Sequence, residues 1–422
     1  MSNRRDFIRN SVLFAGAISI GSNDLFAYPP MPVNGDDEVA YWSLLRAQFP
    51  LSKNKIFLNN GTMGPSPFVV LNEVYQDMLD VDSNGRYGGH EDIAIKALAR
   101  LLNSKDTEIT LTRNVTEGIN ISCFGLPLKA GDEVILSTHE HVGNATPWLN
   151  RAKLHGIVIK AIPLGKTAEE TLDIVKSAIT KKTKVIALPH IPCTIGQVLP
   201  VKAICTLARE RGIFSFVDGA HPPGMLQLDV KDIGCDMYAG CCHKWLMGPK
   251  GTGFLYVSEE FRNTLQVYYG GGGFDTGWDM LSNPPTLKGY IDNGHRYYYG
   301  TQNASLFKGI AKAVEFQENI GRARIEERVK SLATYLQEQL LFLSDDIEML
   351  TPTEAISRGA QVSFKIKNKD MAKLQAQCNE QKITTRFVAE NNINCLRIST
   401  HIYNNYKEID SFLTEVDKFI KA

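Results

Sequence analysis

The sequence predicts an α/β protein in which a large domain with a mainly parallel sheet is joined to a smaller α+β domain. From about residue 90 onward, short apolar runs alternate with helical segments, which is typical of a parallel sheet covered by helices. Between residues 311 and 343 the apolar spacing instead fits long amphipathic helices. The chain has 422 residues, whereas single hydrophobic cores stop growing at roughly 250–300 residues. We therefore expect two domains.

The elements of both domains can be assigned in chain order. Residues 91–102 (EDIAIKALARLL) have apolar side chains at helical spacing and predict a helix. Short apolar runs predict buried strands at residues 132–136, 157–162, 184–188 and 213–217. Helices are predicted between them at residues 168–179 and 201–211. In the carboxyl-terminal part, a helix at 369–380 is flanked by strands at 361–366 and 394–398.

Composition argues against several classes of protein. The 46 Lys and Arg residues balance 46 Asp and Glu residues, and no basic run is present, so the chain does not look like a nucleic-acid-binding protein. The eight cysteines show neither a CxxC motif nor Cys/His ligand spacing, which argues against a disulfide scaffold and a zinc module. No G-x-G-x-x-G motif follows an early strand, which disfavours an NAD-dependent enzyme.

Residues 1–27 are typical of a twin-arginine export signal. Arg4 and Arg5 precede an apolar run from Val12 to Ile20 and small residues near Ala27. The run has about nine residues and a membrane-spanning helix needs about 20, so a retained anchor is the less favoured alternative. We expect the protein to be folded in the cytoplasm and exported to the periplasm by the twin-arginine machinery.

The strongest chemical signal lies in residues 213–257. Asp218 follows an apolar strand, which places its carboxylate at the carboxyl end of that strand, where open α/β sheets bind ligands. Lys244 follows in a stretch rich in glycine and proline. A partly desolvated lysine amine is a nucleophile toward an aldehyde, and a carboxylate keeps a pyridine nitrogen protonated. Considered alone, Asp218 could simply cap a helix, and Lys244 could simply lie on the surface. Together they form the minimal pair for pyridoxal phosphate chemistry.

This segment contains the motifs FVDGAHPPG (216–224) and AGCCHKWLMGPKGTGFLYV (239–257). Both motifs resemble the aminotransferase class V family of fold-type I pyridoxal phosphate enzymes. The resemblance extends over nearly all of the chain after the export signal and is strongest to the isopenicillin N epimerase-like branch. It implies pyridoxal 5'-phosphate as the cofactor and a seven-stranded sheet. It also implies a linker and a segment packing on the small domain at 28–60, a large cofactor domain at 61–310 and a small domain at 311–422.

The resemblance implies roles for individual residues. Lys244 would bond the cofactor aldehyde and then move the α-proton of the substrate. Asp218 would pair with the ring nitrogen, and His221 would bond the ring oxygen. His141 in THEHVGNATPW (138–148) would stack on the ring. The phosphate would lie at the helix start in ITLTRNVTEGIN (109–120). The remaining cofactor-binding residues implied are Val115, Thr116, Cys241 and His243.

The substrate is expected to be a small molecule, an amino acid. Arg397 in CLRISTHIYNN resembles the carboxylate-binding arginine of the family, since a planar guanidinium grips a carboxylate with two hydrogen bonds. Arg386 in ITTRFV and Asn60 in IFLNNGTMGPSP (56–67) are further candidates. Thr301 in GTQN (300–303) resembles the residue that reaches the phosphate of the neighbouring subunit, which implies a homodimer.

The sequence also departs from the family. Desulfurases carry a cysteine on the loop that follows Arg386, but FVAENNIN (387–394) has none, and Cys395 lies in the next strand. Val115, Cys241 and Cys193 replace hydrogen-bonding residues of relatives. The same residues serve epimerisation, transamination and β-elimination. The sequence therefore favours an epimerase-like enzyme or an aminotransferase, with a C–S lyase, a β-lyase, a desulfurase-like enzyme and a non-catalytic binding protein as alternatives.

Overall fold

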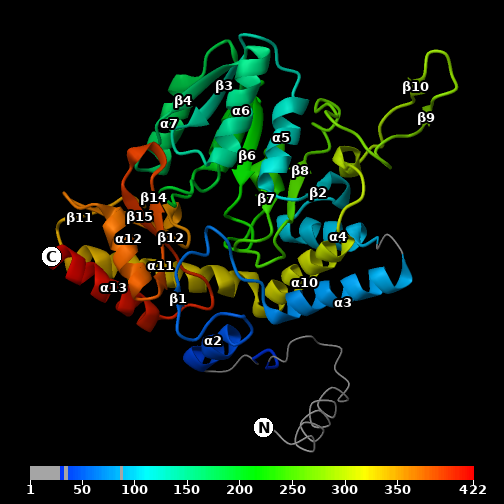
Figure 1. Cartoon of the computed structure of the whole chain (residues 1–422). Helices are drawn as coiled ribbons and strands as arrows, with labels where there is room; N and C mark the ends of the chain where they lie inside the picture. Colours follow the sequence, from blue (N-terminus) through cyan, green and yellow to red (C-terminus); the bar gives the residue numbers. More distant parts are fainter. Residues whose placement is uncertain (1–28, 33–36, 86–88) are drawn as a thin grey trace, which may run out of the picture.

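The computed structural model describes residues 29–32, 37–85 and 89–422. The predicted export signal at residues 1–27 lies outside this part of the chain. Within the described ranges, no helix combines the length and the apolar character that crossing a membrane requires. Figure 1 shows a central sheet with helices beside it and, near the carboxyl terminus, a second sheet packed against long helices.

The large unit is built on seven strands in the order β2-β8-β7-β6-β5-β3-β4. The sheet is mainly parallel, because only β8 runs antiparallel to its neighbours β2 and β7. This confirms the predicted fold class. The strands are β2 (Ile109–Thr112), β3 (Glu133–Ser137), β4 (Val158–Ile162), β5 (Thr183–Pro189), β6 (Phe214–Gly219), β7 (Met237–Cys241) and β8 (Gly253–Val257).

Helices cover both faces of this sheet, as its largely buried central strands require. Successive side chains of a strand point to opposite faces. In β3, Val134 and Leu136 therefore join a core with α5 and α6, whereas Ile135 joins a core with α7 and α8. These helices are α5 (Val115–Gly125), α6 (Val142–His155), α7 (Ala168–Ala178) and α8 (Val201–Glu210). The strands and helices predicted for this region are present, with ends that differ by only one or two residues.

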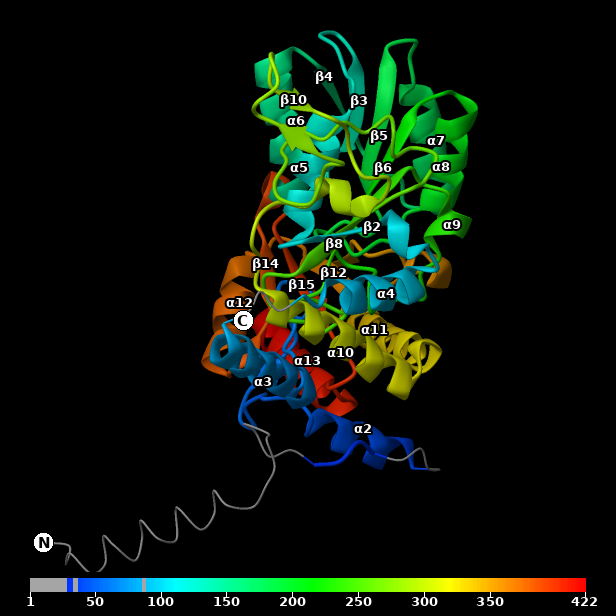
Figure 2. The same ribbon diagram turned by 90° about the vertical axis from the view of Figure 1, so that its right-hand side faces the viewer.

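Three further helices close the sheet near β2 and β8. The predicted helix α4 (Glu91–Leu102) has the expected bounds, and α10 (Ala304–Ile320) packs against it and against α3 (Phe68–Asn84). Leu98 and Ile310 share a buried core with Phe254 of β8. Figure 2 shows α3, α4 and α10 below the sheet.

The smaller unit contains an antiparallel sheet in the order β11-β12-β15-β14. Its strands are β11 (Ile347–Met349), β12 (Gln361–Ile366), β14 (Arg386–Val388) and β15 (Cys395–Ser399). The helices α11 (Arg322–Leu343), α12 (Met371–Glu380) and α13 (Tyr406–Lys421) pack on it. The long helical pattern predicted from residue 311 starts earlier, in α10, and it breaks at Gly321, whose φ of 97° lies outside helical geometry.

The amino-terminal part of the described chain lies on this smaller unit. Strand β1 (Ile56–Phe57) pairs in parallel with β13 (Ile383–Thr384). Helix α2 (Glu38–Arg46) precedes it and buries Trp42 and Leu45. The sequence pattern did not predict α2 or α3. Both pack on parts of the chain that are distant in sequence: Arg324 of α11 lies over the ring of Tyr41 in α2, and α3 packs against α10.

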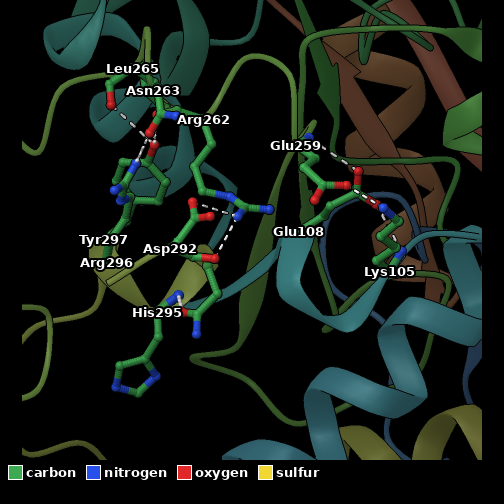
Figure 3. Close-up of polar contacts among 11 residues, drawn as sticks. Lys105, Glu108, Glu259, Arg262, Asn263, Leu265, Asp292, His295, Arg296 and Tyr297 are labelled. Atoms are coloured by element: carbon green, nitrogen blue, oxygen red, sulfur yellow. Dashed lines mark hydrogen bonds and ion pairs between the residues drawn. The ribbon is translucent and has the colours of Figure 1, made fainter. Parts of the chain in front are cut away.

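A long loop with a short hairpin projects from the large unit (Figure 1). The hairpin pairs β9 (Trp278–Asp279) with β10 (Thr286–Leu287). Figure 3 shows how the base of this loop is held: Arg262 Nη1 donates to both the carbonyl and the carboxylate of Asp292, at 2.6 and 3.0 Å. Tyr297 Oη donates to the carbonyl of Arg262. The tip is apolar and open, since Leu281 is 97% exposed.

Candidate active site

One cavity of about 210 Å³ contains all but two of the predicted site residues. It lies where β5, β6 and β7 end, at the carboxyl edge of the parallel sheet, and the small-unit strands β14 and β15 form its other side. The predicted residues that line it are Val115, Thr116, His141, Asp218, His221, Cys241, His243, Lys244, Arg386 and Arg397.

Asp218 is the penultimate residue of β6 and is only 4% exposed. Its Oδ1 accepts a hydrogen bond from the backbone N–H of Ala220 at 3.0 Å. Burial raises the pKa of Asp218, and the nearby Lys244 ammonium opposes this rise. A carboxylate in this position can be kept ionised by a cationic partner that enters the cavity.

Lys244 lies on a tightly fixed loop between β7 and β8. The next residue, Trp245, is fully buried, and its carbonyl accepts a hydrogen bond from Gln317 at 2.7 Å. On the other side of the loop, the N–H of Gly64 donates to the His243 carbonyl at 2.9 Å. A Cβ on Gly64 would lie 2.2 Å from the Lys244 carbonyl oxygen, so only glycine allows this approach. The loop backbone is thus held while the amine extends into the cavity.

His221 is buried beside the lysine. Its Nε2 lies 3.4 Å from Lys244 Nζ. Its Nδ1 lies 3.1 Å from Trp245 Nε1, which donates to it, and 3.3 Å from Gln361 Nε2. Because an indole N–H only donates, Nδ1 must be the acceptor, and the neutral ring carries its proton on Nε2, facing the cavity. Burial, and then Lys244, lower the pKa of His221 well below its ordinary value, which favours this neutral form.

His141 and Thr116 meet at the starts of two helices. His141 caps α6, and its Nδ1 accepts from the Gly143 N–H at 3.0 Å. His141 is exposed to the open cavity, yet the packed protein around it and Lys244 lower its pKa to about 4. A Cβ on Gly143 would lie 2.6 Å from Thr116 Oγ1 and 3.1 Å from His141 Nδ1. The missing side chain of Gly143 therefore lets these two groups lie close together.

The amino terminus of α5 provides an anion site in the same cavity. Asn114 Oδ1 caps the helix by accepting from the Glu117 N–H at 3.0 Å. Val115 and Thr116 are the first helical residues, and N–H groups at this position have no partner within the helix. Such groups, together with the helix dipole, favour a phosphate.

These donors fit pyridoxal 5'-phosphate. Lys244 supplies an amine for the aldehyde, Asp218 a carboxylate for the ring nitrogen and the α5 start a phosphate site. Among the described residues, His243 Nδ1 is buried without a hydrogen-bond partner.

The two arginines of the opposite side differ in their surroundings. Arg397 is 1% exposed, and it donates to the Cys193 carbonyl at 2.8 Å, to Thr62 Oγ1 at 3.0 Å and to Asn59 Oδ1 at 3.2 Å. Burial, and then Arg386, lower the pKa of Arg397 to about 9. Arg386 forms an ion pair with Glu390.

Two predicted site residues lie outside the cavity lining. Asn60 is fully buried behind Gly61, and its Oδ1 accepts from Tyr403 Oη at 2.9 Å. Thr301 is exposed in the loop before α10. Within this single chain Thr301 does not reach the cavity, so its predicted role in a neighbouring subunit stays a prediction.

All eight cysteines lie in the described part of the chain, and each is buried and free. Cys241 lines the cavity, and its thiol contacts the Ala220 carbonyl at 3.2 Å. Burial raises the pKa of Cys241 to about 11 and that of Cys395 to about 12. Neither thiol is therefore a ready nucleophile at neutral pH.

Sequence reasoning missed the side chains that hold the site residues. Trp245 and Gln361 both bond His221. The position of Trp245 beside Lys244 gave a local signal that could have been used. Gln361 lies 140 residues from His221 in sequence and gave none. Glu390, which pairs with Arg386, lies in the loop where the sequence showed only that a cysteine is lacking.

Comparison with known proteins agrees with this geometry. The chain is 28% identical over 389 residues to isopenicillin N epimerase of Amycolatopsis lactamdurans, covering 87% of this chain and 96% of the relative. It is 28% identical over 410 residues to a probable cysteine desulfurase of Borreliella burgdorferi, covering 89% and 96%. A C-DES mutant with glycine covalently linked to its PLP cofactor superposes with a TM-score of 0.81, at 26% identity, covering 89% of this chain and 99% of that one.

A second structure of the same protein, described as a cystine C–S lyase in complex with its product cysteine persulfide, gives a TM-score of 0.80 at 26% identity, covering 88% and 100%. The sequence profile named Aminotransferase class-V matches residues 91–412, which include the carboxyl edge of the sheet, Lys244 and both cavity arginines. The chain therefore belongs to the aminotransferase class V family.

Proposed function

We propose that this protein acts at the α-carbon of an amino acid, as an epimerase-like enzyme or an aminotransferase. Membership of the class V family makes pyridoxal 5'-phosphate its cofactor. The observation that carries the proposal is the position of Lys244 Nζ, 3.4 Å from His221 Nε2, in one cavity with Asp218, His141 and Arg397.

Each side chain has a distinct task in this proposal. The bound cofactor supplies an electrophilic carbon and an electron-withdrawing ring that ease bond breaking at the α-carbon. Lys244 is the base that removes the α-proton and the acid that returns it. The His221 Nε2–H faces the amine and can donate to an oxygen in the cavity. Arg397 binds the substrate carboxylate and so fixes which bond at the α-carbon faces Lys244.

The first experiment asks whether the lysine and the cofactor act together. The purified wild-type protein is expected to be yellow, and Lys244→Ala is expected to lose this visible absorbance. In deuterated buffer, the wild type should exchange the α-proton of its substrate, followed by proton NMR over a panel of amino acids. A colourless wild type that cannot be reconstituted with pyridoxal phosphate would contradict the proposal. Spectral binding without any exchange or product would favour a non-catalytic binding protein.

Product analysis separates the possible reactions. A D-amino acid, seen by chiral chromatography, indicates epimerisation, and a 2-oxo acid together with an aminated acceptor indicates transamination.

A C–S lyase or desulfurase-like reaction is the second candidate. It is supported by the similarity to C-DES and to the desulfurase relatives. The buried Cys395, with its raised pKa, argues against a reaction that needs this thiol as nucleophile. Release of a persulfide or of sulfide from cystine or cysteine, unchanged in Cys395→Ala, would favour the lyase.

We also propose that two chains associate as a homodimer in which Thr301 serves the neighbouring cavity. The projecting hairpin supports this, because Trp278, Met280 and Leu281 at its tip are 67%, 68% and 97% exposed. Apolar side chains in such a group mark an interaction surface more often than isolated ones do. Light scattering should give twice the chain mass, and mixing inactive Lys244→Ala with inactive Thr301 variants should restore part of the activity. A monomer with full activity would contradict the proposal.

Export by the twin-arginine machinery is proposed from residues 1–27 alone. A reporter fused after residue 30 is expected in the periplasm, and Arg4→Lys with Arg5→Lys should retain it in the cytoplasm.

A further inference from the structure

The protein places one of its own carboxylates on an arginine of the cavity. Glu390 Oε1 forms an ion pair with Arg386 Nη2, and the two side chains are 29% and 22% exposed. Arg386 lines the cavity next to Arg397, since the two residues face each other in the pairing of β14 with β15. Both guanidinium groups donate to the same acceptor, the Cys193 carbonyl, at 3.4 Å from Arg386 and 2.8 Å from Arg397.

The loop that carries Glu390 is held at both ends. Asn391 Nδ2 donates to the Thr138 carbonyl of the large unit. At the other end, Asn394 Oδ1 accepts from the Met371 N–H at 3.0 Å. Asn391, Asn392 and Asn394 have φ of 52°, 57° and 52°, a region that asparagine tolerates better than most residues. Glu390 is therefore fixed near Arg386 by the backbone as well as by the ion pair.

The two arginines consequently differ in charge balance. The partners of Arg397 are a carbonyl, an amide oxygen and a hydroxyl, all of them neutral. Among the described residues Arg397 has no carboxylate partner, whereas Arg386 has one in Glu390. The charge of Glu390 also reaches the cavity, because it is among the groups that act on His141 and Arg397. On the small-unit side of the cavity, a ligand thus meets one cation without a carboxylate partner, Arg397, and one neutralised ion pair.

We propose that Glu390 sets the substrate class: the cavity accepts amino acids with a single carboxylate and rejects those with a second carboxylate near the first. This inference rests on the proposed function and adds the substrate class to it. A single carboxylate binds at Arg397. A second carboxylate would find Arg386 already paired and would meet the negative charge of Glu390, so the selection works by repulsion as well as by attraction.

Glu390→Gln tests the inference, because it removes the charge and keeps the shape. The readout is the change in visible absorbance of the cofactor-loaded protein during titration with L-alanine and with L-glutamate. The wild type should bind L-alanine at least about tenfold more tightly than L-glutamate. In Glu390→Gln, L-glutamate affinity should rise about tenfold, because the second carboxylate can then accept a hydrogen bond from the charged Arg386. A hydrogen bond to a charged group changes affinity by about this factor. L-Alanine affinity should change less than about threefold.

Two further variants serve as controls. Glu318→Gln removes the same charge from another Arg–Glu pair, that of Arg100 with Glu318 at 3.3 Å, and should leave both affinities unchanged. Glu390→Gln combined with Arg386→Gln should lose the gain for L-glutamate, because the freed cation is then absent. A visible cofactor absorbance equal to that of the wild type, measured before any amino acid is added, shows that each variant is folded.

The possible failures can be told apart. If no amino acid changes the absorbance of the wild type, the proposed function fails. If L-alanine binds but wild type and Glu390→Gln discriminate equally against L-glutamate, the proposed function stands and the role of Glu390 is wrong. Tighter binding of L-glutamate than of L-alanine by the wild type would overturn the inference directly.

Discussion

The two sides of the cavity are built differently. The side formed by the large unit carries Asp218, His221, Lys244 and His141, which come from a strand end, the loops that follow β6 and β7, and a helix start. Its imidazoles are held neutral, because the packed protein around them and Lys244 lower the pKa of both His141 and His221. The side formed by the small unit instead carries charged guanidinium groups on adjacent antiparallel strands.

This difference separates the groups that hold the cofactor from the groups that bind and select the substrate. The large-unit side fits a cofactor by position and protonation state. The small-unit side holds the loop without a cysteine and the pair of Glu390 with Arg386. The same cofactor chemistry can therefore be applied to a substrate chosen by a separate part of the molecule.

Asp218→Asn should have the largest effect and should act on the cofactor side alone. Breaking a buried charged pair costs several kcal/mol, so turnover should fall on the order of a hundredfold or more. Steady-state rates and the cofactor dissociation constant measure this loss. Asp236→Asn is the control, because Asp236 is a half-buried aspartate that accepts from Ser215 away from the cavity. Equal losses in both variants would point to a general folding defect.

Glu140→Gln should change how stability depends on pH. Glu140 is buried beside His141, and burial raises its pKa to about 7. Because the folded pKa is raised, the protonated form favours folding, and this contribution is lost as pH rises from about 4.5 to about 7. Relative to Glu140→Gln, the wild type should thus lose about 3 kcal/mol of unfolding free energy over this range. Urea unfolding at pH 4.5 and pH 8 measures it, and a constant difference would show that Glu140 does not titrate there.

Arg397→Lys should act on the substrate side alone. A lysine cannot form two parallel hydrogen bonds with a carboxylate, so amino-acid affinity should fall about tenfold or more while cofactor affinity stays unchanged. Spectral titration separates the two affinities. The same change at Arg386, which is already paired with Glu390, should cost less. A larger loss at Arg386 would reverse the assignment of the two arginines.

Gly143→Ala should give the smallest of these effects, again on the cofactor side. The new Cβ would lie within 3.1 Å of both Thr116 Oγ1 and His141 Nδ1, and both side chains can shift slightly. We expect cofactor affinity to fall about threefold to tenfold, because overpacking costs on the order of 1 kcal/mol. Gly131→Ala is not a suitable control, since Gly131 has a φ of 86°. Gly272→Ala is better, because a Cβ there meets nothing within 4 Å.

Sequence patterns predicted one side of the cavity better than the other. Short apolar runs mark buried strands such as 213–217, and the polar residue that follows such a run marks the edge of the sheet, so Asp218 could be placed from local sequence. Arg397 was found through a resemblance, and the geometry that holds it could not be predicted, because Asn59 and Thr62 lie more than 330 residues earlier in the chain. The position of Glu390 beside Arg386 depends on the backbone conformation of one loop, in which three asparagines have a positive φ. No periodicity in the sequence encodes that conformation.

The pairing of β1 with β13 has a consequence for the order in which the molecule forms. Ile56, made early in synthesis, pairs with Ile383, and Thr62 meets Arg397 across 335 residues. The first segment of the cavity to leave the ribosome is therefore the last to find its partners, since contacts this distant in sequence require the long intervening chain to be closed first. Arg397 gains its contacts with this segment only after nearly the whole chain has been made, so assembly of the substrate side is a late event and a truncated chain cannot complete it.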